Sequence, residues 1–208
     1  MFYGWMAAKG PIRETGTALI VEGYMDLLSL HQEGFRNVVA SLGTALTQAQ
    51  VALLARQARE AVVVFDADES GRKAAQRSLE LFLAEGLSAK VASLPAGFDP
   101  DSYVRREKAE GFRRILSEAV PVVDYMLQQA IRRHGPQTVE GKVRIVRELL
   151  PALNRLADPL EQNLYLEQIA QRLGLKEAQL RDSLSRREPL AKADAGPVRA
   201  AAPPGPLH

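Results

Sequence analysis

Two aspartates one residue apart come directly after an apolar run, in the stretch Ala61-Val-Val-Val-Phe-Asp66-Ala-Asp68. The run predicts a buried strand, and the alternating charged and apolar residues 72–86 predict a helix behind it. Open α/β sheets bind ligands at the carboxyl ends of their strands, which is where both carboxylates would lie. Two such charges about 4 Å apart repel by roughly 4 kcal/mol at an effective dielectric of 20, so a divalent cation between them would be stabilising. Ligands that are all oxygen favour Mg²⁺ or Mn²⁺ over zinc.

A second acidic residue stands at the same point of an earlier strand. Residues 17–21 form a short apolar run, Glu22 follows it, and residues 24–34 predict a helix. Asp26, near the first turn of that helix, either complements the helix dipole or approaches a metal, and both interpretations stay open. An Asp-x-Asp after a strand is also typical of a solvated turn that caps a helix. The matching position of Glu22 is what favours the metal site.

A further acidic pair is found in the stretch Asp99-Pro100-Asp101. Asp99 is suited to cap a helix that has Pro100 at its first position. This capping role explains Asp99 well and Asp101 less well. If the pair emerges beside the same edge of the sheet, it could add metal ligands.

The remaining apolar segments predict an α/β domain. Residues 38–41 and 89–94 complete a strand-helix alternation, which is typical of right-handed crossovers and a mainly parallel sheet flanked by helices. Strands that are apolar throughout indicate burial on both faces. Thr47 and Gln50 form a capping-box pattern for a helix over 48–59. The small-residue loop 42–46 either passes close to a phosphate or is a plain connection, and the second interpretation is the simpler one.

The composition narrows the class of protein. The chain has 208 residues and no cysteine, which excludes disulfides and thiolate zinc sites and fits a reducing cytoplasm. No apolar run approaches the roughly 20 residues of a membrane span, and no signal peptide is visible. The net charge is +2, with −1 over residues 1–120 (14 basic, 15 acidic) and +3 over 121–208 (13 basic, 10 acidic). Neither half has the basic field expected of a self-sufficient nucleic-acid binder.

The two ends of the chain differ from its middle. Phe2, Tyr3 and Trp5 are crowded before any regular element, where packing on the sheet is favoured over stacking on bases. Residues 188–208 are rich in Ala, Pro and Gly without periodicity, which is typical of a disordered tail. From residue 120 the strands give way to an all-α segment with apolar spacing suited to a compact bundle, with helices at 122–134, 139–156, 160–173 and 176–186. The histidines do not cluster, and His31 is expected on a helix surface.

The motifs together resemble one family. They are Val21-Glu22-Gly23-Tyr24-Met25-Asp26, Ala40-Ser-Leu-Gly-Thr44, Phe65-Asp66-Ala-Asp68-Glu-Ser-Gly71-Arg72 and Asp99-Pro100-Asp101. In order and spacing they are similar to the TOPRIM domain of bacterial DnaG-type DNA primases, and the resemblance covers about residues 1–186. The Glu-Gly-Tyr-Met-Asp motif is specific to primases, whereas Asp-x-Asp-x-x-Gly is shared with topoisomerases and related nucleases. The implied division is a remnant of a preceding subdomain (1–16), a TOPRIM domain (17–119), a helical segment (120–187) and a linker or tail (188–208).

The resemblance implies an activity and a set of site residues. The activity is synthesis of short RNA primers on a single-stranded DNA template from ribonucleoside triphosphates, which leaves an RNA–DNA hybrid. The implied catalytic residues and principal Mg²⁺ ligands, with Mn²⁺ as an alternative ion, are Glu22, Asp66 and Asp68. Asp26, Asp99 and Asp101 would be accessory acids, while Arg72 and Lys73 would contact phosphate or be solvated helix charges. The implied setting is the bacterial cytoplasm at the replication machinery, with a replicative helicase as partner and no membrane.

The sequence also departs from the family pattern. Such primases begin with a cysteine/histidine zinc module and a basic subdomain, and a helicase-binding domain would follow the Pro-rich tail. We therefore expect no zinc in this chain, and we expect it to be part of a longer or split primase that binds metal but primes weakly or not at all by itself. Two alternatives stay open: a fragment of another TOPRIM nuclease or topoisomerase, or a non-catalytic module whose helical half docks on a replication partner.

Overall fold

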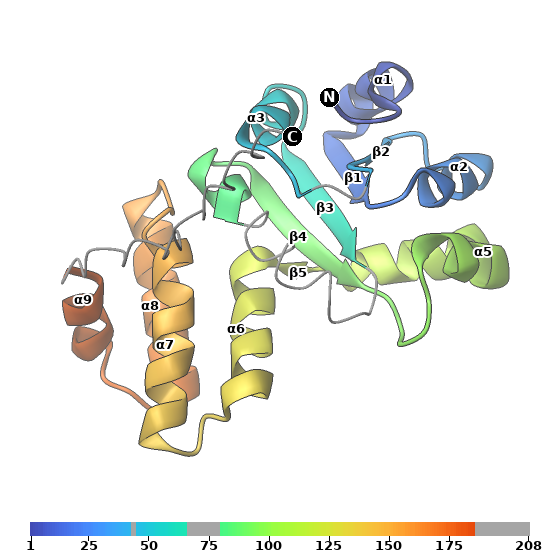
Figure 1. The fold of residues 1–208 in the computed structure, drawn as a ribbon. Helices are drawn as coiled ribbons and strands as arrows, with labels where there is room; N and C mark the ends of the chain where they lie inside the picture. The colour runs from blue at the N-terminus through green and yellow to red at the C-terminus, as the bar shows by residue number, and fades with distance from the viewer. Residues whose placement is uncertain (43–44, 66–79, 186–208) are drawn as a thin grey trace, which may run out of the picture.

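The protein is described by a computed structural model, which covers residues 1–42, 45–65 and 80–185. Its centre is a five-stranded sheet with the strand order β2-β1-β3-β4-β5 (Figure 1). Four strands run parallel, and they are β1 (Thr17–Val21), β2 (Val38–Ala40), β3 (Glu60–Phe65) and β4 (Ser88–Ser93). The predicted mainly parallel sheet flanked by helices is thus confirmed.

One short strand was not predicted. β5 (Val120–Pro121) pairs antiparallel with β4, with Val91 opposite Val120. The expectation that strands end before residue 120 was wrong at this point. Two residues, one of them a proline, give no alternation for a sequence pattern to show, and Pro is tolerated here because β5 lies at the edge of the sheet.

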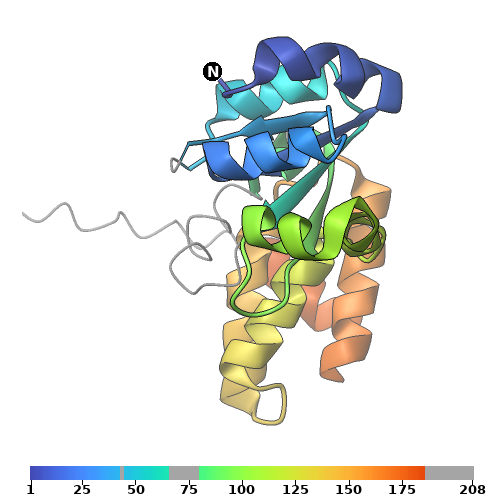
Figure 2. The ribbon, with the colours of Figure 1, turned by 90° about the vertical axis from the view of Figure 1, so that its right-hand side faces the viewer.

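Helices cover both faces of the sheet. α2 (Tyr24–Gln32) and α5 (Pro100–Ser117) lie side by side on one face, which Figure 2 shows in front of the strands. α1 (Trp5–Thr15), α3 (Gln48–Ala55), the helical residues 80–84 and α6 (Val122–His134) pack on the other. The strands are apolar throughout because successive side chains point to opposite faces: Leu19 and Val21 pack toward α2 and α5, while Ala18 and Ile20 join the opposite core.

The N-terminal residues form a helix that the sequence did not predict. Gly10 and Pro11 interrupt the apolar pattern of this segment, yet α1 runs through both of them. Phe2 and Trp5 are buried in the core on this face of the sheet, so the expectation that the aromatics pack there is confirmed for these two, whereas Tyr3 is 44% exposed. The backbone of Tyr3 exchanges two hydrogen bonds with Ala40 at the sheet edge, at 3.0 and 3.1 Å.

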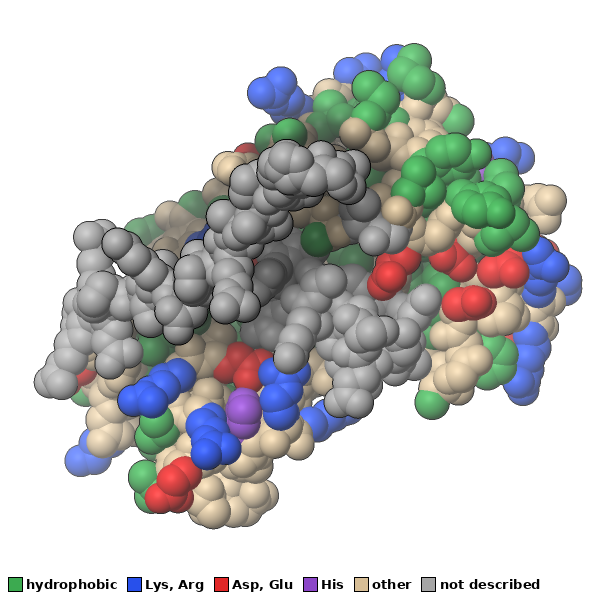
Figure 3. Space-filling view, viewed as in Figure 1, with side chains coloured by type: hydrophobic (Ala, Val, Ile, Leu, Met, Phe, Trp, Pro, Cys, Tyr) green, Lys and Arg blue, Asp and Glu red, His purple; other side chains and the backbone are tan. Residues whose placement is uncertain are grey.

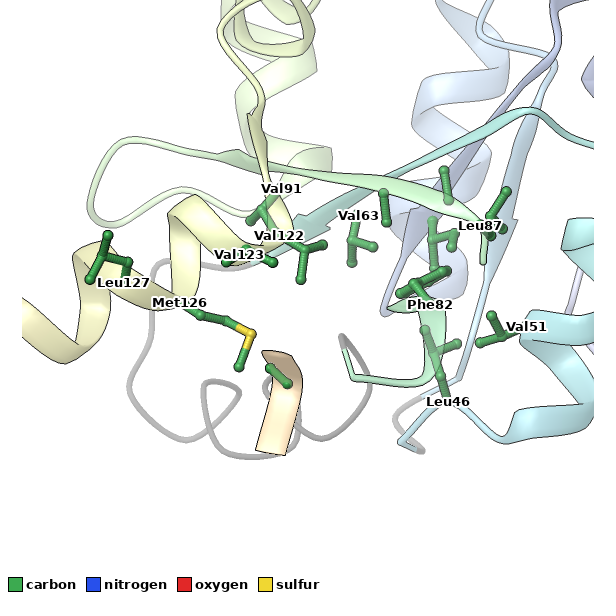
Figure 4. Close-up of a cluster of buried hydrophobic side chains, with 14 of the residues drawn as sticks. Leu46, Val51, Val63, Phe82, Leu87, Val91, Val122, Val123, Met126 and Leu127 are labelled. Atoms are coloured by element: carbon green, nitrogen blue, oxygen red, sulfur yellow. The ribbon is translucent and has the colours of Figure 1, made fainter. Parts of the chain in front are cut away.

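The second half of the described chain is all-α. It contains α6, α7 (Val139–Leu153), α8 (Pro159–Leu173) and α9 (Glu177–Ser185), close to the predicted ranges. Thr138 and Asp158 cap α7 and α8 by accepting from backbone N–H groups. The apolar core of these helices is continuous with that of the sheet: Figure 4 shows Val122, Val123 and Met126 of α6 beside the strand residues.

His31 is less exposed than the sequence predicted. His31 is only half-exposed, and its Nε2 is buried with no hydrogen-bond partner in the described structure, so a simple surface position was wrong. Burial, and then the charge of Arg36, lower the pKa of His31. Within the described ranges, no helix is both long and apolar enough to cross a membrane.

Candidate active site

The carboxyl ends of β1 and β3 lie next to each other. The two strands are parallel neighbours with Ile20 opposite Val63, so the residues that follow them leave the sheet at the same edge. Glu22 follows β1. Asp66 and Asp68 follow β3 in the sequence, but they lie outside the described residues, as do Arg72 and Lys73. The chain reverses its direction of winding between β1 and β3, which is where doubly wound sheets bind their ligands.

The turn that carries Glu22 is held by the loop after β2. The carbonyl oxygen of Glu22 accepts a hydrogen bond from the Leu42 N–H at 2.9 Å, and that of Val21 accepts from the Ser41 N–H at 3.1 Å. Leu42 has a φ of 60°, a left-handed conformation that costs a non-glycine residue roughly 1–2 kcal/mol. The backbone N–H groups of Ser41 and Leu42 therefore support the Glu22 turn, while Gly43 and Thr44 lie outside the described residues.

Asp26 is buried between two helix N-termini. Its side chain is one of three buried polar ones in the described structure, with the residue 8% exposed. Its Oδ2 accepts from the Gly23 N–H at 2.9 Å, at the start of α2, and its Oδ1 accepts from the Asp101 N–H at 3.2 Å, in the first turn of α5. The helix-terminus role is therefore confirmed for Asp26, and the same carboxylate also links two separate helices.

Asp101 is held by its own partners. Its Oδ1 accepts from the Ser29 hydroxyl of α2 and from Arg105 Nε at 2.6 Å, one turn further along α5. Neither partner was predicted from the sequence. Arg105 stands four residues after Asp101, a spacing at which opposite charges pair on a helix, so this pair could have been found. Ser29 carried no comparable signal, because its contact with Asp101 joins two helices that are distant in the sequence.

Asp99 caps α5, as predicted. Its Oδ1 accepts from the Ser102 N–H at 2.7 Å, and Pro100 occupies the first turn of the helix. Hydrogen bonds from Ser102 lower the pKa of Asp99, so its exposed carboxylate is ionised at neutral pH. The structure thus brings Asp26, Asp99 and Asp101 together at the carboxyl edge of the sheet.

The electrostatics of this edge favour a cation. Burial is the main cause that raises the pKa of Asp26, and the negative charges of Asp99 and Asp101 raise it further, against the two N–H donors that lower it. Figure 3 shows acidic side chains gathered on this side of the molecule, next to hydrophobic ones, over the region where Figure 1 places α2 and α5. The donors are carboxylate oxygens, which suit a hard divalent cation. Among the described residues alone, however, no three acidic or histidine side chains are placed to hold a metal ion.

Comparison with known proteins agrees with this geometry. The profile of a family described as Toprim-like matches residues 19–104, and that of a family described as the DnaB-helicase binding domain of primase matches residues 123–178. The DNA primase of Clostridium acetobutylicum is 38% identical over 169 residues, which are 81% of this chain and 28% of that protein. The DNA primase of Myxococcus xanthus is 32% identical over 202 residues, which are 97% of this chain and 33% of that protein.

Solved structures show the same likeness. A DNA primase domain from Pseudomonas aeruginosa superposes with a TM-score of 0.79 at 34% identity, over 88% of this chain and 59% of that one. A DnaG primase catalytic domain bound to single-stranded DNA gives a TM-score of 0.77 at 30% identity, over 86% and 58%. Fold and site therefore define a TOPRIM-like domain joined to a helical bundle. Across the matched regions, the chain is similar to the catalytic domains of DnaG-type DNA primases.

The comparisons also show how much of each relative the chain spans and where the helicase-binding region lies. The chain spans about a quarter to a third of the length of the curated relatives it matches. The match to the helicase-binding family lies on α6 to α9, whereas we had expected such a domain only beyond the Pro-rich tail. That placement was wrong because it was based on the apolar spacing of these helices, which predicts a compact bundle and does not indicate what the bundle binds.

Proposed function

We propose that this chain is the catalytic-core portion of a DNA primase, which joins ribonucleotides into short primers on single-stranded DNA during bacterial replication. The observation that carries the proposal is the meeting of β1 and β3 at a switch point, with Glu22 after one strand and Asp66 and Asp68 after the other. The similarity to primase catalytic cores over most of the chain supports it.

The residues have distinct roles in this proposal. Glu22, Asp66 and Asp68 hold a divalent ion, Mg²⁺ or Mn²⁺, and Asp99 and Asp101 add charge beside it. The bound ion would neutralise the triphosphate and stabilise the leaving oxygen. Glu22 would help to fix the place of the ion, because it follows strand β1 at a turn that the backbone N–H groups of Ser41 and Leu42 hold. Arg72 and Lys73 bind phosphate oxygens of the nucleotide or the template.

The reaction is a nucleotidyl transfer. The 3′-hydroxyl of the growing primer attacks the α-phosphate of an incoming ribonucleoside triphosphate, the bond between the α- and β-phosphates breaks, and pyrophosphate leaves. The protein contributes alignment and charge rather than a covalent nucleophile. This agrees with the described edge of the site, where Asp26, Asp99 and Asp101 supply carboxylates.

The metal site can be tested on the 208-residue chain itself. We expect wild-type protein to bind Mn²⁺ in isothermal titration calorimetry, and we expect Asp66→Asn with Asp68→Asn to abolish that binding. Glu110→Gln, which removes one exposed acid from α5, serves as the matched control and should bind like wild type. Unchanged Mn²⁺ affinity in the double variant would overturn the site. Template-dependent incorporation of labelled ribonucleotides, with and without Mn²⁺, then tests the reaction.

A second function is favoured by the match on α6 to α9. We propose that this bundle docks on a replicative helicase of the DnaB type, so that priming occurs beside the moving helicase in the cytoplasm. The two functions are compatible, because the bundle and the sheet edge occupy different parts of the structure (Figure 1). Retention of the purified helicase from the same organism on the immobilised chain tests this function. The control is the chain without α6 to α9, and it is valid only if circular dichroism shows that this shortened chain is folded.

A further inference from the structure

Asp26 differs from the other acids of the site in how its oxygens are used. Both of them already accept backbone N–H groups, and the residue is 8% exposed. Asp99, in contrast, is exposed, and Glu22 is half-exposed. Each oxygen of Asp26 keeps a second lone pair, but the residue is buried, so direct binding of an ion is less favourable here than at the more exposed acids.

The two N–H groups that Asp26 binds belong to two different turns of the site. Gly23 directly follows Glu22, so the bond from its N–H fixes the backbone that carries that carboxylate. Asp101 lies in the first turn of α5, which begins after β4. One side chain therefore sets the distance between the turn after β1 and the helix that carries Asp99 and Asp101.

Ser29 extends this link. It lies three residues after Asp26 on the same side of α2, is 3% exposed, and donates its hydroxyl to Asp101 Oδ1. Arg105 binds the same oxygen and lies 3.5 Å from the Ser29 hydroxyl. α2 therefore contacts Asp101 twice, at its backbone through Asp26 and at its carboxylate through Ser29.

We propose that Asp26, with Ser29, is a positioning residue that holds the Glu22 turn and the Asp101 helix at a fixed spacing and does not itself bind the ion. This inference rests on the proposed function, since it assigns a role within that metal site. The proposed role explains both hydrogen bonds of the buried acid in the Glu-Gly-Tyr-Met-Asp motif. Helix capping needs only the contact with Gly23, whereas the contact with Asp101 joins α2 to another helix.

Amide hydrogen exchange and Mn²⁺ titration of the 208-residue chain test the proposal together. In Asp26→Asn, an NH₂ group replaces one oxygen, so one of the two N–H groups loses its acceptor. We expect exchange at Gly23 or Asp101 to accelerate at least about tenfold while β1 amides keep their wild-type rates. We expect Mn²⁺ affinity to fall about tenfold or more at unchanged stoichiometry, as for other supports of metal ligands. Ser29→Ala should weaken Mn²⁺ binding in the same direction, although it removes no carboxylate.

Each other outcome has a definite meaning. If Asp26→Asn abolishes Mn²⁺ binding and leaves both amides protected, Asp26 is a ligand and the proposal is wrong. If exchange accelerates but Mn²⁺ affinity is unchanged in both variants, the contacts serve only the fold, and the positioning role is again overturned. If wild-type chain binds no Mn²⁺ at all, the proposed metal site fails first and the positioning role fails with it. The wild-type titration therefore separates the two failures.

Discussion

Replacing Gly23 by alanine tests how tightly the site is built around Asp26. The backbone of Gly23 has an ordinary φ of −100°, so alanine can adopt it without strain. A Cβ at this position, however, would lie 2.8 Å from Asp26 Oδ2, closer than real Cβ contacts. The carboxylate cannot simply swing away, because its other oxygen is bound to the Asp101 N–H. Alanine must therefore break a hydrogen bond or separate the two helices.

The size of the effect follows from these contacts. A hydrogen bond to a charged group is worth roughly 1.5–3 kcal/mol, and the lower backbone entropy of unfolded alanine returns about 0.4–1 kcal/mol. We expect Gly23→Ala to lower the free energy of unfolding by about 1–2 kcal/mol. For a chain of this length, each kcal/mol shifts Tm by roughly 2–4 °C, so the fall should be about 2–8 °C. Mn²⁺ affinity should fall as well, because Glu22 precedes the displaced turn.

Thermal and urea unfolding, combined with a mutant cycle, make this test specific. In an Asp26→Ala background the clashing oxygen is gone, so Gly23→Ala should cost much less than in wild type. Gly10→Ala is the matched control: a Cβ there meets nothing within 4 Å, and the gain in helix preference is offset by the following Pro11, so stability should change by less than about 1 kcal/mol. A Gly23→Ala chain as stable as wild type, with unchanged Mn²⁺ affinity, would refute the reasoning.

Three further predictions follow from the described structure. Burial raises the pKa of Asp26 in the folded state. As the pH rises from the ordinary value of 3.8 through the folded value, wild type should therefore lose stability relative to Asp26→Asn, which urea unfolding across that range measures. A pH-independent difference would contradict the burial of its charge. Arg155, in the turn after α7, has its Nε 3.3 Å from Glu80 Oε2, with side chains 46% and 18% exposed. Reversing either charge should cost up to about 1 kcal/mol, and reversing both should restore most of it. Additive losses would mean that the pair does not join this turn to residues 80–84. Leu149 is 1% exposed in the core that the bundle and the sheet share. Leu149→Ala should lower the free energy of unfolding by about 2–5 kcal/mol, and the chain should still unfold in a single transition. Loss of the bundle signal alone would show that the two parts unfold separately.

The elements with strong local signals could be predicted from the sequence. The β-branched, apolar residues 62–64 favour a strand that is buried on both faces, so this strand and its parallel neighbours could be predicted. The cap of α5 was found because Asp99 and Pro100 each satisfy a local requirement of a helix start. α1 and β5 could not be predicted, because Gly10, Pro11 and Pro121 are locally unfavourable in a helix or a strand. Tertiary packing forms both elements in spite of these residues.

Which of the acids are buried and which are exposed could not be predicted from the sequence. The sequence places Glu22, Asp26, Asp99 and Asp101 after strands or at helix starts, which is enough to bring them to one edge of a parallel sheet. It does not say which of them is buried, because burial depends on the packing of α2 against α5, two helices about seventy residues apart in the sequence. Only that packing brings the Asp101 N–H to Asp26 and the Ser29 hydroxyl to the Asp101 carboxylate. It therefore decides that Asp26 is buried and bonded while Asp99 faces the solvent.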